Sequence, residues 1–266
     1  MPSINASEAP VRGEPVIRVI DLDTGYDGVP ILANITFDVR RGEVFGILGG
    51  SGSGKSTVMK NIIGLHPPIA GRIYFGDLDI VSADDDALGT ITSRFGVMYQ
   101  SGALFGSMTL LENVRLPLET ATDLPDKAID LIARMKLELV GLEAFTGRLP
   151  AELSGGMQKR AGIARAMALD PEILFLDEPS SGLDPITAAS LDELIRRLSD
   201  SLGVTFVIVT HDLASVFTAL DRVILLDRGA KGIIAEGDPR QLRDENDDPR
   251  VRAFFRREPR VEATVA

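Results

Sequence analysis

The chain has 266 residues, of which 44% are hydrophobic and 25% are charged, a balance typical of a globular protein with one large domain or two small ones. Its formal net charge of −11 argues against a generally basic surface and therefore against a nucleic-acid partner. The absence of cysteine excludes disulfides and thiolate metal sites, and it fits a reducing compartment.

The sequence contains neither a membrane span nor a secretion signal that we can recognise. No apolar run approaches the ~18 residues needed to cross a bilayer, and the first residues, MPSINASEAPVRGEP, contain no apolar signal core. We therefore expect a cytoplasmic protein that acts at a membrane only through a partner.

The first hundred residues are predicted to form mainly strands, after a loose polar lead-in over residues 1–14. The apolar pattern predicts strands over 16–23, 31–39, 43–50, 72–80 and 94–100, with a turn over 25–30. A glycine-rich loop follows the third of these strands, and a helix is predicted over 57–65.

The rest of the chain alternates helices and strands. From Leu110 to Met167 the spacing is helical, with helices predicted over 110–118 and 126–142 and after Ser154. Strands follow over 172–179, 204–212 and 222–227, separated by a helix over 186–202 and a short helix, and the charged tail from Asp238 is predicted to be helical around 251–257. This alternation predicts an α/β fold with a mostly parallel sheet, into which the central helical block is inserted.

The stretch GGSGSGKST matches the phosphate-loop pattern G-x-x-x-x-G-K-[ST] between an apolar strand and a helix. Its glycines let backbone N–H groups turn toward phosphate oxygens, and the helix N-terminus adds positive potential. Lys55 can reach the β- and γ-phosphates, the Ser56 hydroxyl can ligate Mg²⁺, and Thr57 can add a hydroxyl contact. An accidental match is the alternative, and the strand–loop–helix context argues against it. The predicted nucleotide-binding residues are Gly49, Gly50, Ser51, Gly52, Ser53, Gly54, Lys55, Ser56 and Thr57.

Two acids and a histidine follow predicted strands at the edge of the sheet where ligands bind in open α/β folds. Asp177 and Glu178 end the run ILFLDEP, so Asp177 can hold Mg²⁺ and Glu178 can orient or deprotonate an attacking water. His211 follows VTFVIVT at the same edge. The alternatives are solvated acids and a structural histidine. His66, in GLHPP, has no such context and is predicted to be a turn residue.

A second helix start has a phosphate-binding pattern without a lysine. Ser154, Gly155 and Gly156, in LSGGM, stand just before a run with helical spacing, which is typical of an anion-binding helix N-terminus. The alternative is an ordinary serine N-cap, and both uses involve the same groups.

Together these motifs resemble those of the nucleotide-binding subunits of ABC transporters, over nearly all of residues 16–240. The resemblance implies the ABC ATPase fold, a P-loop NTPase (RecA-like) fold with a mostly parallel sheet, an antiparallel β subdomain and a helical insert at about 101–167. It implies an ATPase domain over 15–240, followed by a C-terminal extension over 241–266. For this extension two alternatives stay open: a contact with the neighbouring subunit, as in the MCE-type phospholipid transporters to which parts of the chain are similar, or a solvated charged helix end. It also implies a head-to-tail homodimer in which the LSGGM segment of each subunit caps the γ-phosphate bound by the other.

The resemblance further implies roles for single residues. Tyr26 resembles the aromatic that stacks on adenine, and Gln100 the glutamine that senses Mg²⁺ and the γ-phosphate. Asp184, in SGLDP, is expected at the dimer seam. The implied catalytic residues are Glu178, His211, Gln100 and Lys55, and the implied Mg²⁺ ligands are Ser56, Gln100 and Asp177. Two positions depart from the commonest pattern: Met157 replaces a glutamine, and Gly50 replaces a proline found in many relatives.

The segments QSGALFGSMTLLENVRLPL, ELSGGM and DPRVRAFF are similar to the ATPase subunits of MCE-type phospholipid transporters. This similarity implies a dimeric integral-membrane permease and an MCE-domain lipid-binding protein as partners, with the chain on the cytoplasmic face of the inner membrane. The alternatives are an importer subunit for amino acids or similar solutes, an ABC-type ATPase of DNA repair or translation, and a small-molecule P-loop kinase. The LSGGM and SGLD segments have no role in such a kinase.

Overall fold

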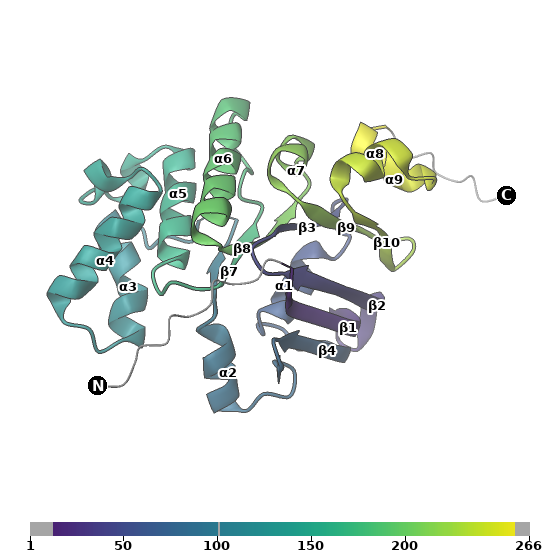
Figure 1. The fold of residues 1–266 in the computed structure, drawn as a ribbon, viewed down its shortest axis with the longest axis horizontal. Coiled ribbons are helices and arrows are strands. Elements are labelled where there is room, and N and C mark those ends of the chain that lie inside the picture. Colours follow the sequence, from purple (N-terminus) through teal and green to yellow (C-terminus); the bar gives the residue numbers. More distant parts are fainter. Residues whose placement is uncertain (1–12, 101, 259–266) are drawn as a thin grey trace.

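The computed structural model describes residues 13–100 and 102–258. Residues 1–12 of the predicted lead-in, residue 101, and residues 259–266 of the predicted C-terminal extension lie outside this part of the chain. Within it, the strands form a six-stranded and a four-stranded sheet, and helices cover the larger one (Figure 1).

The larger sheet is mostly parallel, which confirms the prediction. In spatial order its strands are β10 (Gly232–Gly237), β9 (Arg222–Asp227), β3 (Val44–Gly49), β8 (Thr205–Thr210), β7 (Ile173–Asp177) and β6 (Phe95–Met98). Neighbouring strands are parallel except β9 and β10. Every residue of β3 and β8 is buried, because the central strands of a parallel sheet are covered on both faces.

The smaller sheet is antiparallel, as the resemblance implied. It contains β2 (Val29–Arg40), β1 (Pro15–Tyr26), β4 (Ala70–Phe75) and β5 (Leu78–Asp79), in that order. Asp27 and Gly28 join β1 to β2, and their φ angles of 52° and 74° suit a two-residue hairpin turn. The turn is therefore shorter than the predicted 25–30. The single strand predicted over 72–80 is instead a hairpin, because the chain turns at residues 76–77.

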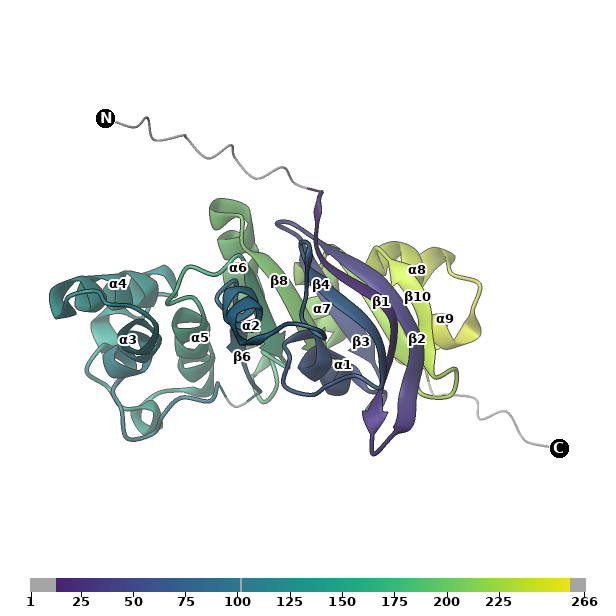
Figure 2. The same cartoon turned by 90° about the horizontal axis from the view of Figure 1, so that it is seen from below.

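The two faces of the larger sheet pack into different layers (Figure 1, Figure 2). Phe45 and Ile47 of β3 join the core formed with α1 (Lys55–Ile62) and the smaller sheet. Val44 and Leu48 join the other core, which includes α6 (Pro185–Leu202) and α7 (Leu213–Ala219). The alternation follows from the two-residue period of a strand.

The predicted helical block lies at one end of the larger sheet, where α5 contacts the edge strand β6 (Figure 2). It contains α3 (Leu110–Ala121), α4 (Asp126–Leu139) and α5 (Gly155–Ala166), with 3₁₀ turns at Glu143–Phe145 and Pro150–Glu152. A capping box at the start of α3 pairs Thr109 with Glu112. None of the described helices is both long and apolar enough to cross a membrane.

Three short elements were absent from the sequence-based expectations: α2 (Asp85–Thr92), β10 and α8 (Pro239–Glu245). Of the α2 residues only Ile91 is buried, so its sequence has no apolar stripe to indicate a helix. The helix predicted around 251–257 is confirmed as α9 (Pro249–Arg256).

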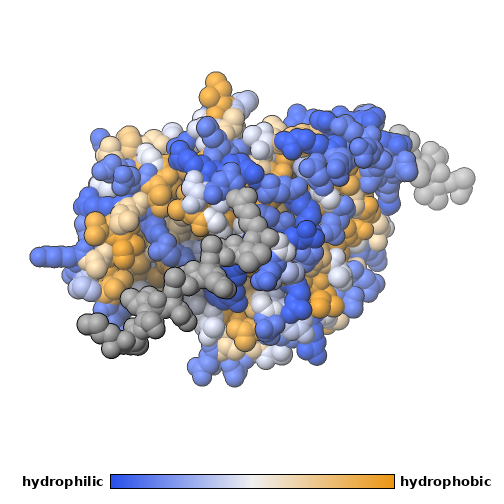
Figure 3. All heavy atoms as spheres, viewed as in Figure 1, coloured by the Kyte–Doolittle hydropathy of each residue, from blue (hydrophilic) through white to orange (hydrophobic). Residues whose placement is uncertain are grey.

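The described part of the tail packs against its own chain. Val251 and Phe255 of α9 are buried, and the Phe255 ring centroid lies 6.0 Å from that of Phe217 on α7. The outward surface of α8 and α9 is strongly hydrophilic (Figure 3). The tail therefore has an apolar side that contacts this subunit and a charged side that faces solvent.

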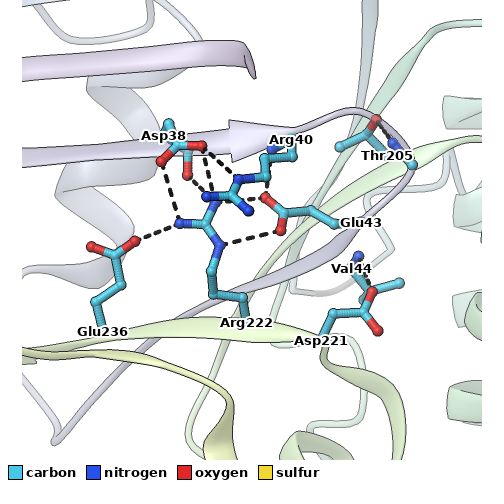
Figure 4. Close-up of polar contacts among 9 residues, drawn as sticks. Asp38, Arg40, Glu43, Val44, Thr205, Asp221, Arg222 and Glu236 are labelled. Atoms are coloured by element: carbon cyan, nitrogen blue, oxygen red, sulfur yellow. Dashed lines mark hydrogen bonds and ion pairs between the residues drawn. The ribbon is translucent and has the colours of Figure 1, made fainter. Parts of the chain in front are cut away.

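Arg222 ties the two sheets together (Figure 4). Its guanidinium donates to Glu43 Oε1 at 2.9 Å and to the backbone oxygen of Asp38 at 2.6 Å, and it also pairs with Glu236 of β10. It lies 4.9 Å from the Phe45 ring centroid. Loss of the Arg222 guanidinium would leave the Glu43 carboxylate, which is only 12% exposed, without this partner.

Candidate nucleotide site

The parallel strands bring three separate motifs to one edge of the sheet. β3 ends at Gly49, β8 at Thr210 and β7 at Asp177, and these strands are neighbours in the sheet. The glycine loop, the two acids and His211 therefore follow the carboxyl ends of adjacent strands, where open α/β folds bind ligands.

The glycine loop needs glycine at two of its positions. A Cβ atom at Gly49 (φ 156°) would lie 2.3 Å from Ser53 Oγ and 2.7 Å from the Leu226 oxygen. A Cβ atom at Gly54 (φ 97°), directly before α1, would lie 2.7 Å from Leu32 Cδ1. The loop thus curls closely over the sheet, and α1 begins immediately behind it.

Lys55 is folded back over the loop. Its Nζ donates to the backbone oxygens of Gly49 at 3.0 Å and Gly50 at 3.1 Å. Burial lowers the pKa of Lys55, while the negative charges of Glu178 and Asp177 oppose that shift. The ammonium can exchange these carbonyls for phosphate oxygens with little reorganisation.

The residues at this edge fit a magnesium ion. Asp177 Oδ1 and Ser53 Oγ are buried and have no hydrogen-bond partner within the described chain. Burial and then the charge of Glu178 raise the pKa of Asp177, while nearby lysines and the Ser56 hydroxyl oppose the shift. Mg²⁺ prefers hard oxygen donors such as a carboxylate and a hydroxyl beside substrate phosphates, so a partly unsatisfied carboxylate next to Ser56 suits it.

Glu178 and His211 meet across the ends of β7 and β8. Glu178 Oε1 lies 2.7 Å from His211 Nδ1, and the Glu178 backbone has a left-handed φ of 48°. A residue other than glycine adopts this conformation at a cost of about 1–2 kcal/mol, and it persists where surrounding contacts hold it. The two side chains line an open pocket of about 390 Å³ with Ser180, Ser181, Gly182, Asp212 and Arg257.

Gln100 and Asp184 lie around the same region in different ways. Gln100 Nε2 donates to Ser181 Oγ at 3.3 Å, which places the glutamine beside the pocket. Asp184 instead caps α6, where its Oδ1 accepts from the backbone N–H groups of Ile186 and Thr187 at 3.1 Å each. In this single subunit, Asp184 therefore has a helix-capping contact and is part of the loop that follows the pocket residues.

The LSGGM segment forms a helix start in the helical block. Ser154 is the N-cap of α5, and its Oγ accepts from Met157 N at 3.3 Å. Ser154 and Gly155 are exposed, whereas Met157 is partly buried and packs against the core. In the described chain no hydrogen bond joins residues 154–156 to residues 49–57. The exposed groups are free to bind a ligand outside this subunit's own loop.

Tyr26 packs against His66, which the sequence predicts to be only a turn residue. Its exposed ring lies 4.8 Å, centroid to centroid, from the ring of His66. His66 Nε2 lies 2.8 Å from the Gly25 backbone oxygen, and Asn61 Nδ2 donates to the His66 oxygen at 2.7 Å. His66 thus supports the tyrosine rather than only ending a turn. The sequence signal was weak, because the two rings lie 40 positions apart.

A family model described as "ABC transporter" matches residues 32–181. A Mycobacterium leprae protein named "Probable ribonucleotide transport ATP-binding protein mkl" is 41% identical over 239 residues, 90% of this chain and 68% of that protein. The "Intermembrane phospholipid transport system ATP-binding protein MlaF" of Escherichia coli K12 is 42% identical over 225 residues, 85% of this chain and 82% of that protein.

A solved structure, the dimer of an ATP-binding cassette in a post-hydrolysis state bound to ADP and Pi, superposes with a TM-score of 0.73. The two chains are 32% identical, and the alignment covers 84% of this chain and 98% of the other. This likeness confirms the predicted fold class.

Proposed function

This chain belongs to the ABC transporter family of ATP-binding proteins, and from that premise we propose that it hydrolyses ATP to power phospholipid transport between membranes. The proposal of ATP hydrolysis rests on the position of Lys55, Asp177 and Glu178 at one edge of the sheet, where the negative charges of both acids act on the lysine. The proposal of phospholipid as the substrate rests on the 42% identity to the E. coli phospholipid transport protein, which aligns over most of both chains.

The phosphate loop and Tyr26 form the nucleotide-binding surface. Backbone N–H groups of residues 49–57 and the N-terminus of α1 hold the phosphates, and Lys55 neutralises the β- and γ-phosphate charge. The exposed Tyr26 ring stacks on adenine, and His66 packs against Tyr26 at 4.8 Å. These are the interactions expected for ATP.

Ser56 and Asp177, joined by Gln100, would hold Mg²⁺, which would draw charge from the phosphates when bound. Glu178 orients the attacking water and accepts its proton as the new oxygen–phosphorus bond forms. The bond between the γ-phosphorus and its bridging oxygen breaks, which leaves ADP and inorganic phosphate. His211 Nδ1, 2.7 Å from Glu178 Oε1 in this structure, steadies the carboxylate when it carries the ring proton, and in the other tautomer Nε2 can donate to a γ-phosphate oxygen.

The exposed Ser154 end of α5 supports a head-to-tail homodimer. Its serine hydroxyl and free N–H groups suit a phosphate that another subunit's Lys55 already holds. A similar cassette has been solved as a dimer. A two-fold axis would build both composite sites at once, with Asp184 near the seam.

Transport requires membrane partners. The E. coli relative is named as part of an intermembrane phospholipid transport system, which supports a membrane partner for this chain. We propose that the partners are a dimeric permease, with this chain on the cytoplasmic face of the inner membrane, and an MCE-domain protein that carries the lipid. The α3–α5 block, which follows Gln100, is the surface through which nucleotide binding would move the permease.

The mycobacterial relative supports a second candidate substrate. Its name assigns it to ribonucleotide transport, and it aligns with a larger share of this chain, although the chain spans only about two thirds of that protein. A solute of this kind would be handled by the same ATPase mechanism through a different permease.

A pull-down of the tagged full-length chain from its native membranes in mild detergent separates these candidates. Proteins and bound small molecules are identified together by mass spectrometry. Recovery of a permease, an MCE-domain protein and phospholipid supports the proposal. Recovery of a permease with a solute-binding protein and no MCE-domain protein would refute phospholipid transport while leaving the ATPase mechanism intact.

A further inference from the structure

Lys159 is a buried cation in the middle of α5, and only 7% of the residue is exposed. Its Nζ donates to the backbone oxygen of Gln100 and, at 3.3 Å, to the backbone oxygen of Glu178. One ammonium therefore joins α5 to two candidate site residues that follow different strands, β6 and β7.

The contact with Glu178 lies at a backbone position that needs support. Glu178 has a left-handed φ of 48°, and its N–H donates to the Val209 oxygen at 2.8 Å. Lys159 holds the carbonyl on the other side of the same residue. The direction of the Glu178 side chain is thus set between β8 and α5.

The contact of Lys159 with Gln100 is one of several contacts between α5 and the chain that follows β6, which includes residues 100 and 102–103. Arg165 donates to the backbone oxygens of Ala103 at 2.6 Å and Gly102 at 3.4 Å. A Cβ atom at Gly162 would lie 3.1 Å from the Gly102 oxygen, so α5 and this segment are in close contact. The segment is held to α5 on the helix face that carries residues 159, 162 and 165.

Burying an ammonium is costly, because it gives up strong hydration. Burial lowers the pKa of Lys159, and the negative charges of Glu178 and Asp177 oppose that shift. The carbonyls and these two carboxylates therefore offset the cost at this one point.

We infer that Lys159 is a positioning residue for ATP hydrolysis, which fixes the backbones of Gln100 and Glu178 relative to the Ser154 end of α5. Lys159 lies five residues from Ser154, or about 7.5 Å along the helix axis at 1.5 Å per residue. When the Ser154 end engages a nucleotide, the movement of α5 passes directly to both site residues. The inference deepens the proposed ATPase function and rests on it.

The test compares the full-length chain with Lys159→Met, Lys159→Arg and Lys136→Met in steady-state ATPase assays with Mg²⁺–ATP. Lys136 is the matched control, since it is also 7% exposed and in the helical block but pairs with Asp170, a residue outside the pocket. A misplacement of about 1 Å at reacting groups can cost on the order of 10²-fold in rate, so we expect K159M to lower kcat at least tenfold, with KM for ATP within about twofold. K159R should retain kcat within about threefold, because a guanidinium can donate to both carbonyls. K136M should change the melting temperature more than kcat.

The inference would be overturned if K159M kept kcat within about threefold of the wild type, or if it changed only the KM for ATP. It would also be overturned if K159M lowered kcat no more than K136M does, because misplaced reacting groups predict a large fall in kcat. Failure of K159R to restore kcat would overturn it too. If K159M is unfolded at the assay temperature, Lys159→Gln replaces it, because the amide can still donate to one carbonyl without a buried charge. The same criteria then apply to K159Q.

Glu178→Gln in the same series distinguishes a failure of the proposed ATPase function from a failure of the Lys159 inference alone. A wild-type chain without ATPase activity, or an E178Q chain as active as the wild type, would refute the proposed function and the inference with it. An active wild type with an inactive E178Q leaves the proposed function intact, and the Lys159 variants then decide the inference alone.

Discussion

The imidazole Nδ1 of His211 lies 2.7 Å from the carboxylate Oε1 of Glu178, so the residues that follow β8 and β7 bind each other across the mouth of the pocket. The Glu178 side chain is 13% exposed and that of His211 is 66% exposed. The carboxylate is therefore largely enclosed, while the imidazole stays within reach of a ligand from outside. An arriving γ-phosphate can engage the histidine without displacing the glutamate from its strand end.

Glu178→Gln should abolish most turnover while leaving ATP binding intact. The amide keeps the shape of the side chain but accepts no proton, and loss of a general base typically lowers kcat by about 10²–10⁴-fold. Phosphate release and fluorescent-nucleotide binding measure the two effects separately. Near-normal turnover in E178Q would refute the role assigned to Glu178.

His66→Ala should weaken ATP binding by removing the support beneath Tyr26. An aromatic pair contributes about 0.5–1.5 kcal/mol, which corresponds to a roughly two- to tenfold rise in KM for ATP with kcat nearly unchanged. His66→Phe is the matched control, because it keeps a ring against Tyr26 and loses only the bond to the Gly25 oxygen. An unchanged KM in H66A would show that Tyr26 needs no such support.

Asp192→Asn should stabilise the protein above about pH 6. Asp192 is buried on α6, and burial raises its pKa from 3.8 to about 6, with Asp212 contributing and the Ser215 hydroxyl opposing. Because the folded-state pKa is the higher one, the stability from this group is complete below pH 3.8 and is lost as the pH rises through about 6. A pKa difference of about two units between the folded and unfolded states corresponds to a loss of about 3 kcal/mol in the free energy of unfolding, and asparagine, which does not ionise, avoids that loss.

Urea unfolding at pH 5 and pH 8 measures this effect. The gain of D192N over the wild type should be larger at pH 8. Glu193→Gln is the matched control, since Glu193 is the next residue on the same helix and is exposed. A gain that is equal at both pH values would contradict the assignment.

Gly156→Ala should push the start of α5 away from α6. The new Cβ atom would lie 2.4 Å from Thr187 Cγ2, and the Thr187 hydroxyl is held by Asp184, so the threonine cannot simply rotate away. Overpacking of this kind costs about 1–3 kcal/mol. Thr187→Ser removes Cγ2 but keeps the hydroxyl, so the double variant should recover the melting temperature and kcat. No recovery would place the defect elsewhere.

Truncation after Asp247 should lower the stability of the subunit as well as weaken dimer assembly. It removes the buried Val251 and Phe255 side chains, each of which contributes about 1.5–3 kcal/mol. Thermal unfolding of the isolated chain reports the first effect, and light scattering of the ATP-bound E178Q dimer reports the second. If neither changes, the tail has neither role.

Most of the elements that position the site could be predicted from the sequence, because its strongest signals are local. The phosphate loop, the ILFLDEP strand end and the LSGGM helix start each combine a motif with the right periodicity, and each lies in the predicted kind of element. The weaker elements escaped because they bury little: α2 buries only Ile91.

The polar links between motifs could not be predicted. Lys159 is an ordinary helix lysine in the sequence, and its importance comes from two backbone carbonyls that the fold brings to it from positions 59 and 19 residues away. His66 and Tyr26 likewise meet only because α1 packs beneath β1, which no local pattern encodes.

The pairing of β3 has a consequence for synthesis on the ribosome. β3 carries the phosphate loop, yet its hydrogen-bonding neighbours in the sheet are β8 and β9, which begin at Thr205 and Arg222. A nascent chain that has not yet emerged past these strands leaves β3 without either partner. Arg222 cannot join Asp38 and Glu43 until the same late stage. The phosphate loop is therefore synthesised more than 150 residues before the second of the two strands that flank β3, and a chain that stops before Arg222 lacks part of the sheet behind the loop.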